Sequence, residues 1–166
     1  MTKLTLVCAA SIAATCLAPI AATAAPADTA GIKTLEASFA KAVNAKDVDA
    51  IMKVYSPDVF VFDVVPPRQY VGAAAYRADW KGVLAGFAGP VKFELTDLVV
   101  SGDATIAYGH SIQRLIGKDP KGASLDMTVR VSDVYRKTGS AWRIVQEHVS
   151  VPVDLDTGKA DLTSKP

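Results

Sequence analysis

The first half of the chain carries hydrophobic residues at the spacing of helices. A helix is predicted from a cap near Asp28-Thr29 to about Asn44, and Asp47 can cap a second, shorter helix that Pro57 ends. A third helix is predicted from Gly72 to about Phe87. The residues that repeat on the apolar sides of these helices are Ile32, Leu35, Phe39, Ala42 and Val43, then Val48, Ile51, Met52 and Tyr55, then Tyr76, Trp80, Val83 and Leu84.

The second half favours strands. A short strand, Val59–Asp63, precedes the third helix, and two longer ones are predicted at Val91–Val100 and Ala104–Ile116. Met127–Pro152 then predicts two long strands joined by a turn at Lys137-Thr138-Gly139-Ser140. Helices first and consecutive strands afterwards indicate an α+β fold, with the helices on one face of a mainly antiparallel sheet.

Polar residues interrupt the apolar pattern of the last two strands. Counting in twos, Val129, Val131, Asp133 and Tyr135 share one face of the first strand. Ile144, Gln146, His148 and Ser150 share one face of the second. If both faces point into the core, a carboxyl, a phenol, an amide and an imidazole meet among aliphatic neighbours. Buried polar groups need partners, so this arrangement indicates either a structural network or a pocket.

The chain begins like an exported protein. Lys3 is followed by the uncharged apolar run Leu4–Ile20 and by small residues at Ala22-Thr23-Ala24. We therefore expect residues 1–24 to be a cleaved signal peptide, residues 25–153 to form one domain, and residues 154–166 to be a flexible polar tail. The expected location is the periplasm or the medium, with no membrane attachment after cleavage; an uncleaved membrane anchor is the alternative.

Composition excludes several classes of function. Cys8 and Cys16 both lie in the expected signal, so the mature chain would have no thiol nucleophile and no disulfide. The chain has 18 basic and 17 acidic side chains without a basic stripe, which argues against a nucleic-acid partner. Two histidines and an acid could form a metal triad, but none has helical i, i+4 spacing, so neither a metal nor another cofactor is expected.

Four ionisable residues are candidates for chemistry. They are Asp63, at the end of an apolar strand; Asp133 and His148, on the last two strands; and His110, which shares a face with Tyr108, Ile106 and Ile112. A carboxyl in apolar surroundings has a raised pKa that suits proton transfer, and an imidazole titrates near neutrality. Each residue also has a structural reading: Asp63 as a turn cap, Asp133 as a partner of Arg130 or Arg114, and each histidine as a core residue.

The order of elements resembles that of the SnoaL-like and ketosteroid-isomerase-like proteins of the nuclear transport factor 2-like superfamily. The resemblance covers roughly Thr29–Val153, and its most specific parts are Asn44–Asp49, Tyr55–Asp58 and Trp142–Pro152. It implies a cone-shaped fold in which a curved sheet wraps around the helices and encloses a pocket. It also implies homodimers that pack through the sheet.

The resemblance assigns roles to individual residues. The general base of ketosteroid isomerase falls on Asp63, and its neutral, hydrogen-bond-donating carboxyl falls on Asp133. Its oxyanion tyrosine falls on Phe39, which cannot donate a hydrogen bond, so steroid isomerisation itself is not implied. His148 and His110 fall on pocket positions that are small or apolar in that enzyme. An acid with two histidines is closer in residue types to scytalone dehydratase.

Two functions remain open from the sequence. The first is cofactor-free proton transfer by an isomerase, dehydratase or cyclase-like enzyme acting on a small apolar or carbonyl-containing molecule. Asp63 would be the base, Asp133 and His148 would stabilise the enolate, and His110 would assist. The residues expected to shape and orient the ligand are Trp80, Tyr108, Tyr135 and Gln146. The second is a non-catalytic small-molecule binding domain or dimeric scaffold, because a fold alone does not establish catalysis.

Overall fold

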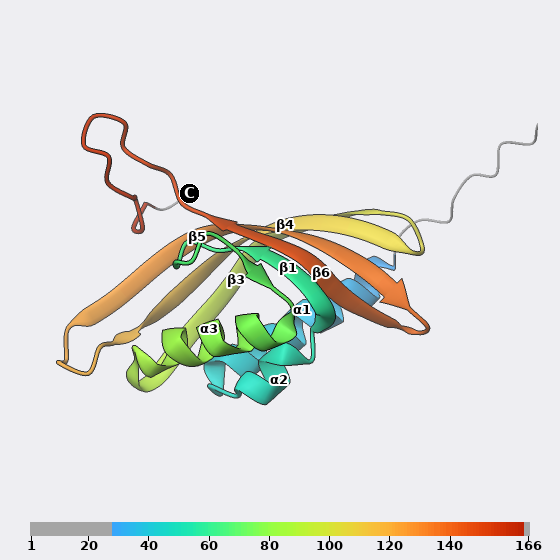
Figure 1. Cartoon of the computed structure of the whole chain (residues 1–166), viewed down its shortest axis with the longest axis horizontal. Coiled ribbons are helices and arrows are strands. Elements are labelled where there is room, and N and C mark those ends of the chain that lie inside the picture. Colours follow the sequence, from blue (N-terminus) through green and yellow to red (C-terminus); the bar gives the residue numbers. More distant parts are fainter. Residues whose placement is uncertain (1–27, 165–166) are drawn as a thin grey trace, which may run out of the picture.

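A computed structural model describes residues 28–164. The expected signal peptide at residues 1–24 lies outside the described residues and stays a prediction. Three helices and six strands follow one another in the chain, with the long strands last (Figure 1). They are α1 (Thr29–Asn44), α2 (Val48–Met52), β1 (Tyr55–Phe62), β2 (Tyr70–Val71), α3 (Ala73–Ala85), β3 (Ala88–Gly102), β4 (Ile106–Lys118), β5 (Ser124–Thr138) and β6 (Ala141–Ser150).

The first two helices begin at the aspartates expected from the sequence. The Asp28 carboxylate accepts a hydrogen bond from the Gly31 N–H at 2.9 Å, and the Asp47 carboxylate accepts one from the Ala50 N–H at 2.9 Å. The second helix is shorter than predicted. It ends at Met52, and Tyr55 begins β1 instead of continuing the helix, so the expectation for Tyr55 was wrong.

The six strands form one curved sheet in the order β2-β1-β6-β5-β4-β3. All neighbouring pairs are antiparallel except β1 and β6, which are parallel. The three helices lie together on one side of the sheet, and the other side is open (Figure 1). The predicted α+β fold, with N-terminal helices packed on a curved, mainly antiparallel sheet, is confirmed.

The side of the sheet that the helices cover is its inner face. The core lies between the helices and this inner face. The buried side of α3 presents Tyr76, Trp80 and Leu84, which are spaced four residues apart. Phe39 of α1 makes edge-to-face contacts with the rings of Trp80 and Phe93, with centroids 5.5 and 5.4 Å apart. Aromatic packing therefore fixes α1 and α3 against the sheet, and this position determines where α3 can present Tyr76.

A β-bulge in β6 changes which of its residues face the core. Tyr135 pairs with Ile144, but Val134 pairs with Gln146, so Val145 is an extra residue on β6. Side chains alternate strictly along a regular strand, and one extra residue exchanges the two faces beyond it. Ile144 is therefore buried as predicted, whereas four positions later His148 is exposed and Glu147 is buried.

The C-terminal segment returns to the sheet after β6. Val153 pairs with Ala160 in an isolated bridge, and the Thr128 N–H donates to the Leu162 carbonyl at 2.8 Å. Residues 154–164, which we expected to form a flexible tail, thus contact β5 beyond the end of β6. Between residues 28 and 164, none of the helices has the length and hydropathy needed to span a membrane.

We expect Asn44→Ala to destabilise the fold by about 1–3 kcal/mol, because its side chain ties the end of α1 to β3. The Asn44 amide donates to the Phe93 carbonyl at 3.1 Å and accepts from the Phe93 N–H at 2.9 Å. Denaturant unfolding of the purified variant would measure the loss. Lys41→Ala, an exposed change on the same helix, is the control; equal stability of the two variants would contradict this role.

Candidate functional site

Three acidic side chains are buried against the inner face of the sheet. Glu36 of α1, Asp133 of β5 and Glu147 of β6 have exposed fractions of only 2%, 3% and 3%. Asp133 and Glu147 are direct neighbours across the β5–β6 pair. Ionised carboxylates are costly to bury, so such a group needs hydrogen-bond donors or must take up a proton.

Tyrosine hydroxyls supply the donors at Glu147. The Tyr55 hydroxyl donates to Glu147 Oε2 at 2.9 Å, and the Tyr76 hydroxyl forms a short hydrogen bond with Glu147 Oε1. The Tyr76 hydroxyl also lies 3.3 Å from Asp63 Oδ2. A phenol has one hydrogen to donate, so it can bond to both carboxyls only if one of them is protonated and donates to the phenol oxygen. The hydrogen-bonded series Asp63–Tyr76–Glu147 therefore favours one proton shared between the two carboxyls.

A second phenol bridges the other two buried acids. The Tyr135 hydroxyl lies 2.8 Å from Glu36 Oε1 and 3.3 Å from Asp133 Oδ2. The Tyr135 hydroxyl also has only one hydrogen to donate, so either Glu36 or Asp133 must carry a proton. Burial, followed by the negative charges of Glu147 and Glu36, raises the pKa of Asp133 well above its ordinary value. The Glu36–Tyr135–Asp133 group therefore holds at least one proton inside the core.

A cavity of about 60 Å³ lies beside Asp63, Tyr76 and Glu147. Its volume exceeds the roughly 10–15 Å³ that one water molecule requires. Asp63, Tyr76, Asp79 and Glu147 contribute its ionisable groups, and Gln113 contributes an amide. The remaining lining residues are apolar or aromatic: Val64, Val65, Trp80, Val83, Phe93, Leu115, Met127, Val129 and Val149. A mostly apolar wall with a few polar groups is typical of small-molecule pockets.

A wider groove lies next to the cavity along α3. That groove has a volume of about 630 Å³ and shares Val65, Asp79, Val83 and Met127 with the cavity wall. Leu162 of the C-terminal segment lines its outer part. The side chains of these four residues therefore separate the cavity from the groove, and their movement would join the two.

The acids of the cavity have raised pKa values for one main reason, which is burial. Burial raises the pKa of Glu147 to about 7 even though its bonds to Tyr76 and Tyr55 lower it. Burial also raises the pKa of Asp79 to about 6, against the opposing hydrogen bond from Tyr70. Burial also raises the pKa of Asp63 above its ordinary value, although the hydrogen bond from the Val65 N–H, 3.2 Å away, opposes this rise. Near neutral pH, Glu147 can therefore hold a proton while the site retains a proton acceptor.

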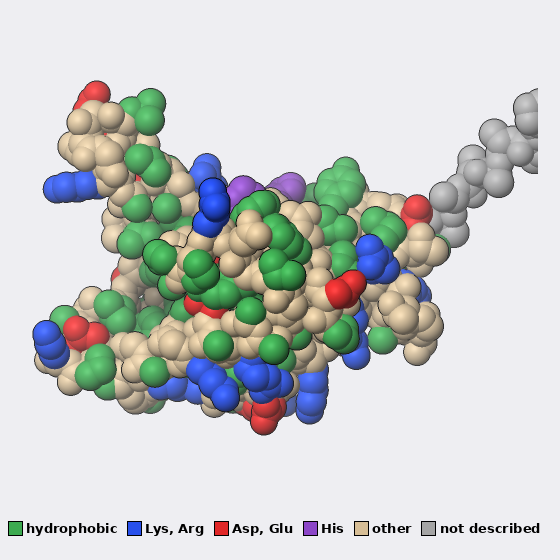
Figure 2. Space-filling model, in the orientation of Figure 1, with side chains coloured by type: hydrophobic (Ala, Val, Ile, Leu, Met, Phe, Trp, Pro, Cys, Tyr) green, Lys and Arg blue, Asp and Glu red, His purple; other side chains and the backbone are tan. Residues whose placement is uncertain are grey.

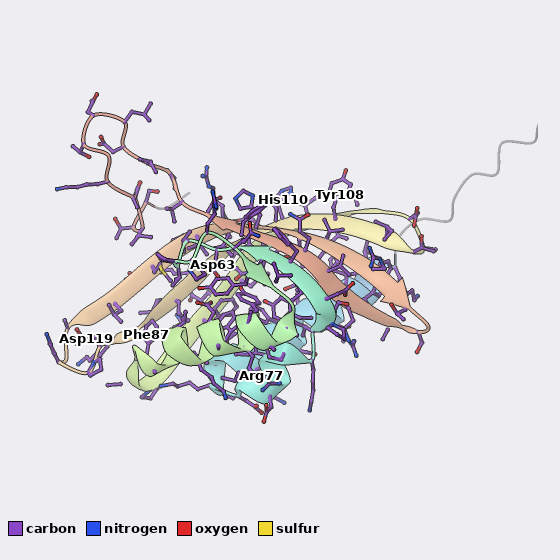
Figure 3. All side chains as sticks on the ribbon, viewed as in Figure 1. Asp63, Arg77, Phe87, Tyr108, His110 and Asp119 are labelled. Carbon is purple, nitrogen blue, oxygen red and sulfur yellow. The ribbon has the colours of Figure 1, made fainter. Side chains whose placement is uncertain are left out.

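The two histidines and Tyr108 do not face this cavity, contrary to the expectation from the sequence. Tyr108 is 61% exposed, and His110 and His148 are exposed as well. Figure 3 places Tyr108 and His110 on the side of the sheet opposite the helices, and Asp63 on the side of α3. The histidine side chains are visible at the molecular surface in Figure 2. The inner face of β4 instead carries Ala107, Gly109, Ser111, Gln113 and Leu115.

The remaining predicted residues divide into three groups. Asp63 and Trp80 line the cavity. Asp133 and Tyr135 are buried beneath it in the Glu36 network and are absent from its wall, so the predicted ligand contact of Tyr135 and the predicted oxyanion contact of Asp133 are not present. Gln146, beside the bulge, is half-buried and also absent from the cavity wall.

Sequence reasoning missed Glu36, Glu147, Tyr55 and Tyr76 as polar members of the site. A signal for Glu36 was present, because it lies four residues after Ile32 and three before Phe39 on the buried side of α1. Tyr76 was assigned only to the core, yet its hydroxyl bonds to two acids. Glu147 could not be found by alternation because the bulge places it where His148 was expected.

Across residues 28–164, no three His, Cys, Asp or Glu side chains are grouped so that they could hold a metal ion. The ionisable groups of the cavity are carboxyls and phenols. The chemistry that they can perform directly is proton transfer and hydrogen bonding.

Comparisons with known proteins agree with this architecture. Residues 32–154 match the model of the SnoaL-like domain. A nuclear transport factor 2-like protein of unknown function from Pseudomonas putida KT2440 is 30% identical, with a TM-score of 0.75 over 85% of this chain and 99% of that one. No curated protein matches the chain.

More distant solved structures share the fold alone. A ketosteroid isomerase-like protein from Erwinia carotovora atroseptica is 18% identical, with a TM-score of 0.62 over 73% of this chain and 93% of that one. A proposed scytalone dehydratase from Novosphingobium aromaticivorans is 14% identical, with a TM-score of 0.66 over 74% of this chain and 82% of that one. The domain match covers most of the chain, and the protein therefore belongs to the SnoaL-like family of the nuclear transport factor 2-like superfamily.

Proposed function

We propose that the protein binds a small carbonyl compound in the cavity beside α3 and catalyses a cofactor-free proton transfer, as an isomerase or a dehydratase. The observation that carries this proposal is the Tyr76 hydroxyl, which lies between Asp63 and Glu147 at the cavity wall. The site thus combines a candidate base, a candidate acid and a phenol that connects them. Fold neighbours named as a ketosteroid isomerase-like protein and a proposed dehydratase are consistent with this class of reaction.

In the proposed reaction, the Asp63 carboxylate removes a proton from the carbon next to the carbonyl. The electrons of the broken C–H bond form a carbon–carbon double bond, and the carbonyl oxygen becomes an enolate oxygen. Neutral Glu147, whose pKa is raised to about 7 by burial, turns its one O–H from the Tyr76 oxygen to the enolate oxygen and donates a hydrogen bond to it. An isomerase returns the Asp63 proton to another carbon. A dehydratase delivers it to a hydroxyl group that leaves as water.

Tyr76 gives this assignment a physical basis. It fixes the relative positions of Asp63 and Glu147, and it allows a proton to pass between them through its hydroxyl. Asp133, the expected hydrogen-bond donor, has no contact with the cavity, so Glu147 takes that role in the proposal. The position that a catalytic tyrosine would occupy is Phe39, which is 1% exposed and packs against Trp80.

Binding without turnover is the alternative function. It is favoured by the mostly apolar cavity wall and by the location of Asp133 away from that wall. The two functions differ in one measurement, because a binding protein would be stabilised by its ligand without exchanging the ligand's protons.

We expect Asp63→Asn to reduce proton exchange at the carbon next to the carbonyl of small ketones by about 100-fold or more, because the general base is removed. The measurement is deuterium incorporation in heavy water, followed by NMR. Asp58→Asn, the same substitution on the exposed part of β1, should leave the rate unchanged. Equal rates in the wild type and Asp63→Asn would exclude Asp63 as the base.

Because acids are buried in its core, we expect the thermal stability of the protein to fall as pH rises from 5 to 8. Burial raises the pKa of Glu147 and of Glu36 from 4.5 to about 7, so the folded state binds more protons than the unfolded state in this interval. Their stabilising contribution is complete below about pH 4.5 and is lost as pH rises through 7; each group contributes on the order of 1–3 kcal/mol.

Glu147→Gln imitates the neutral acid and should make the decline with pH smaller. Melting temperatures across the pH range would show it. Glu94→Gln is the control, because neighbouring Lys92 lowers the pKa of Glu94 and moves its titration below this interval. A melting temperature that rises from pH 5 to pH 8 in the wild type would contradict the protonation assigned to these acids.

We further propose that the protein is a homodimer that packs through the outer face of its sheet. Large apolar side chains are exposed there: Phe62 is 38% exposed, Val99 52%, Ile106 40% and Tyr108 61%. Tyr108→Glu should convert the dimer to a monomer in light scattering, because it places a charge in the contact. Leu155→Glu, a similar change on the C-terminal segment, should leave the mass unchanged. A monomeric wild type would refute the proposal.

A further inference from the structure

The cavity beside α3 is small for a ligand site. Its volume of about 60 Å³ is well below the roughly 300–1,000 Å³ of pockets that take up small molecules. The neighbouring groove has a volume of about 630 Å³. Four residues line both spaces, and we call them the partition: Val65, Asp79, Val83 and Met127. A ligand larger than the cavity can therefore reach Glu147 from the groove only if part of the partition moves.

Two members of the partition are bonded to the same phenol. The Tyr70 hydroxyl, on β2, lies 2.8 Å from Asp79 Oδ1 and 3.4 Å from the Val65 carbonyl oxygen. It also lies 2.9 Å from the carbonyl oxygen of Pro66, the next residue of the chain. Tyr70 is 8% exposed and lines the groove. This phenol therefore links α3 to the β1–β2 loop, which is the segment Asp63–Gln69.

The protonation of Asp79 decides which of these bonds can form. A phenol has one hydrogen to donate, and a backbone carbonyl can only accept. A protonated Asp79 carboxyl donates to the Tyr70 oxygen, and Tyr70 then donates to the Pro66 carbonyl. An ionised Asp79 carboxylate takes the Tyr70 hydrogen instead, because a hydrogen bond to a charged acceptor is the stronger one. The β1–β2 loop is therefore bonded to Tyr70 only while Asp79 holds a proton.

The surroundings of Asp79 place its titration near neutral pH. The other titratable side chains that line the cavity or the groove are Asp63, Tyr70, Tyr76, Asp126 and Glu147. No Lys, Arg or His is among the described residues that line either space, and Asp126 is bonded to Arg114 at 2.6 Å. Burial, and then the charge of Asp63, raises the pKa of Asp79 to about 6, although the bond from Tyr70 opposes this rise. Asp79 is therefore mainly protonated at pH 5 and mainly ionised at pH 7.5.

We propose that Tyr70 and Asp79 form a proton-controlled gate between the groove and the cavity. While Asp79 is protonated, Tyr70 holds the β1–β2 loop and keeps Val65 in the partition. Once Asp79 is ionised, the loop is released, and Val65 can move aside so that a ligand passes from the groove into the cavity. The gate does not depend on the proton transfer assigned to Asp63, because a protein that only binds its ligand needs the same entry.

Trypsin at pH 8 tests the release of the loop, because Arg68 is an exposed residue within it and native-state cleavage follows local opening. Asp79→Asn imitates the protonated acid, since its amide can donate to the Tyr70 oxygen. We expect this variant to be cut after Arg68 about fivefold more slowly than the wild type. Mass spectrometry of the fragments identifies the cut. Asp156→Asn, a change of the same charge on the exposed C-terminal segment, is the control and should be cut at the wild-type rate.

A double variant separates the gate from a simple loss of charge. Asp79→Asn also removes a negative charge near Asp63, and this alone could slow the opening of the loop. In the gate, however, the protection by Asp79→Asn requires the Tyr70 hydroxyl. Tyr70→Phe and Tyr70→Phe/Asp79→Asn should therefore be cut at the same rate, at least as fast as the wild type. Protection that persists in the double variant, or equal rates in the wild type and Asp79→Asn, would refute the gate.

Quenching of Trp80 fluorescence by acrylamide measures access to the cavity, since Trp80 is 9% exposed and lines the cavity wall. The chain has two tryptophans, so Trp142→Phe leaves Trp80 as the only emitter. In this background we expect the quenching constant to rise about threefold from pH 5 to pH 7.5, and to stay at its low value when Asp79→Asn is added. A constant that does not rise, or that rises equally with Asp79→Asn, would overturn the gate. Neither experiment uses a substrate, so a failure of the proposed reaction would leave both results unchanged.

Discussion

The structure depends on how buried carboxyl groups are accommodated without a basic hydrogen-bond partner among residues 28–164. Glu36, Asp133 and Glu147 lie in the core, and their hydrogen-bond partners are phenols rather than lysines or arginines. Because one phenol cannot donate to two carboxylates, the bonds of Tyr76 and Tyr135 require protonated acids. Glu36 Oε2 and Asp133 Oδ1 are buried without a hydrogen-bond partner among the described residues, which adds to the cost of ionising either acid. These acids and phenols come from α1, α3, β5 and β6. The packing of these four elements therefore depends on the protons that their side chains share.

The same arrangement relates stability to function. Inside the core, Glu36, Tyr135 and Asp133 form a network that does not line the cavity, although Asp133 is the direct neighbour of Glu147 across the β5–β6 pair. At the cavity wall, Glu147 and Asp63 share Tyr76, and a ligand can reach them. Sites that need an acid and a base place titratable groups in environments that separate their pKa values. Here burial differs between the two carboxyls, since Glu147 is buried and Asp63, at the end of β1, is half-buried.

Local signals in the sequence predicted most of the fold. Aspartate caps, apolar spacing and the Lys137–Ser140 turn indicated the helices and the last two strands because each depends on neighbouring residues. The short β2 and the parallel pairing of β1 with β6 are long-range features without such a signal. Asp63 and Trp80, which the sequence suggested for a pocket, line the cavity. His148 was misplaced because alternation assumes an unbroken register, and His110 because apolar residues also cover the outer face of β4.

The bulge at Val145 has an evolutionary consequence. Deleting this one residue would join Ile144 directly to Gln146, so β6 would alternate regularly with Ile144 and Glu147 still inward and His148 still outward. A strand of unchanged length that paired without the bulge would instead turn the His148 imidazole inward and the Glu147 carboxyl outward. Alignments with related sequences that lack the extra residue therefore need a gap at Val145, because without it they would compare residues from opposite sides of the sheet.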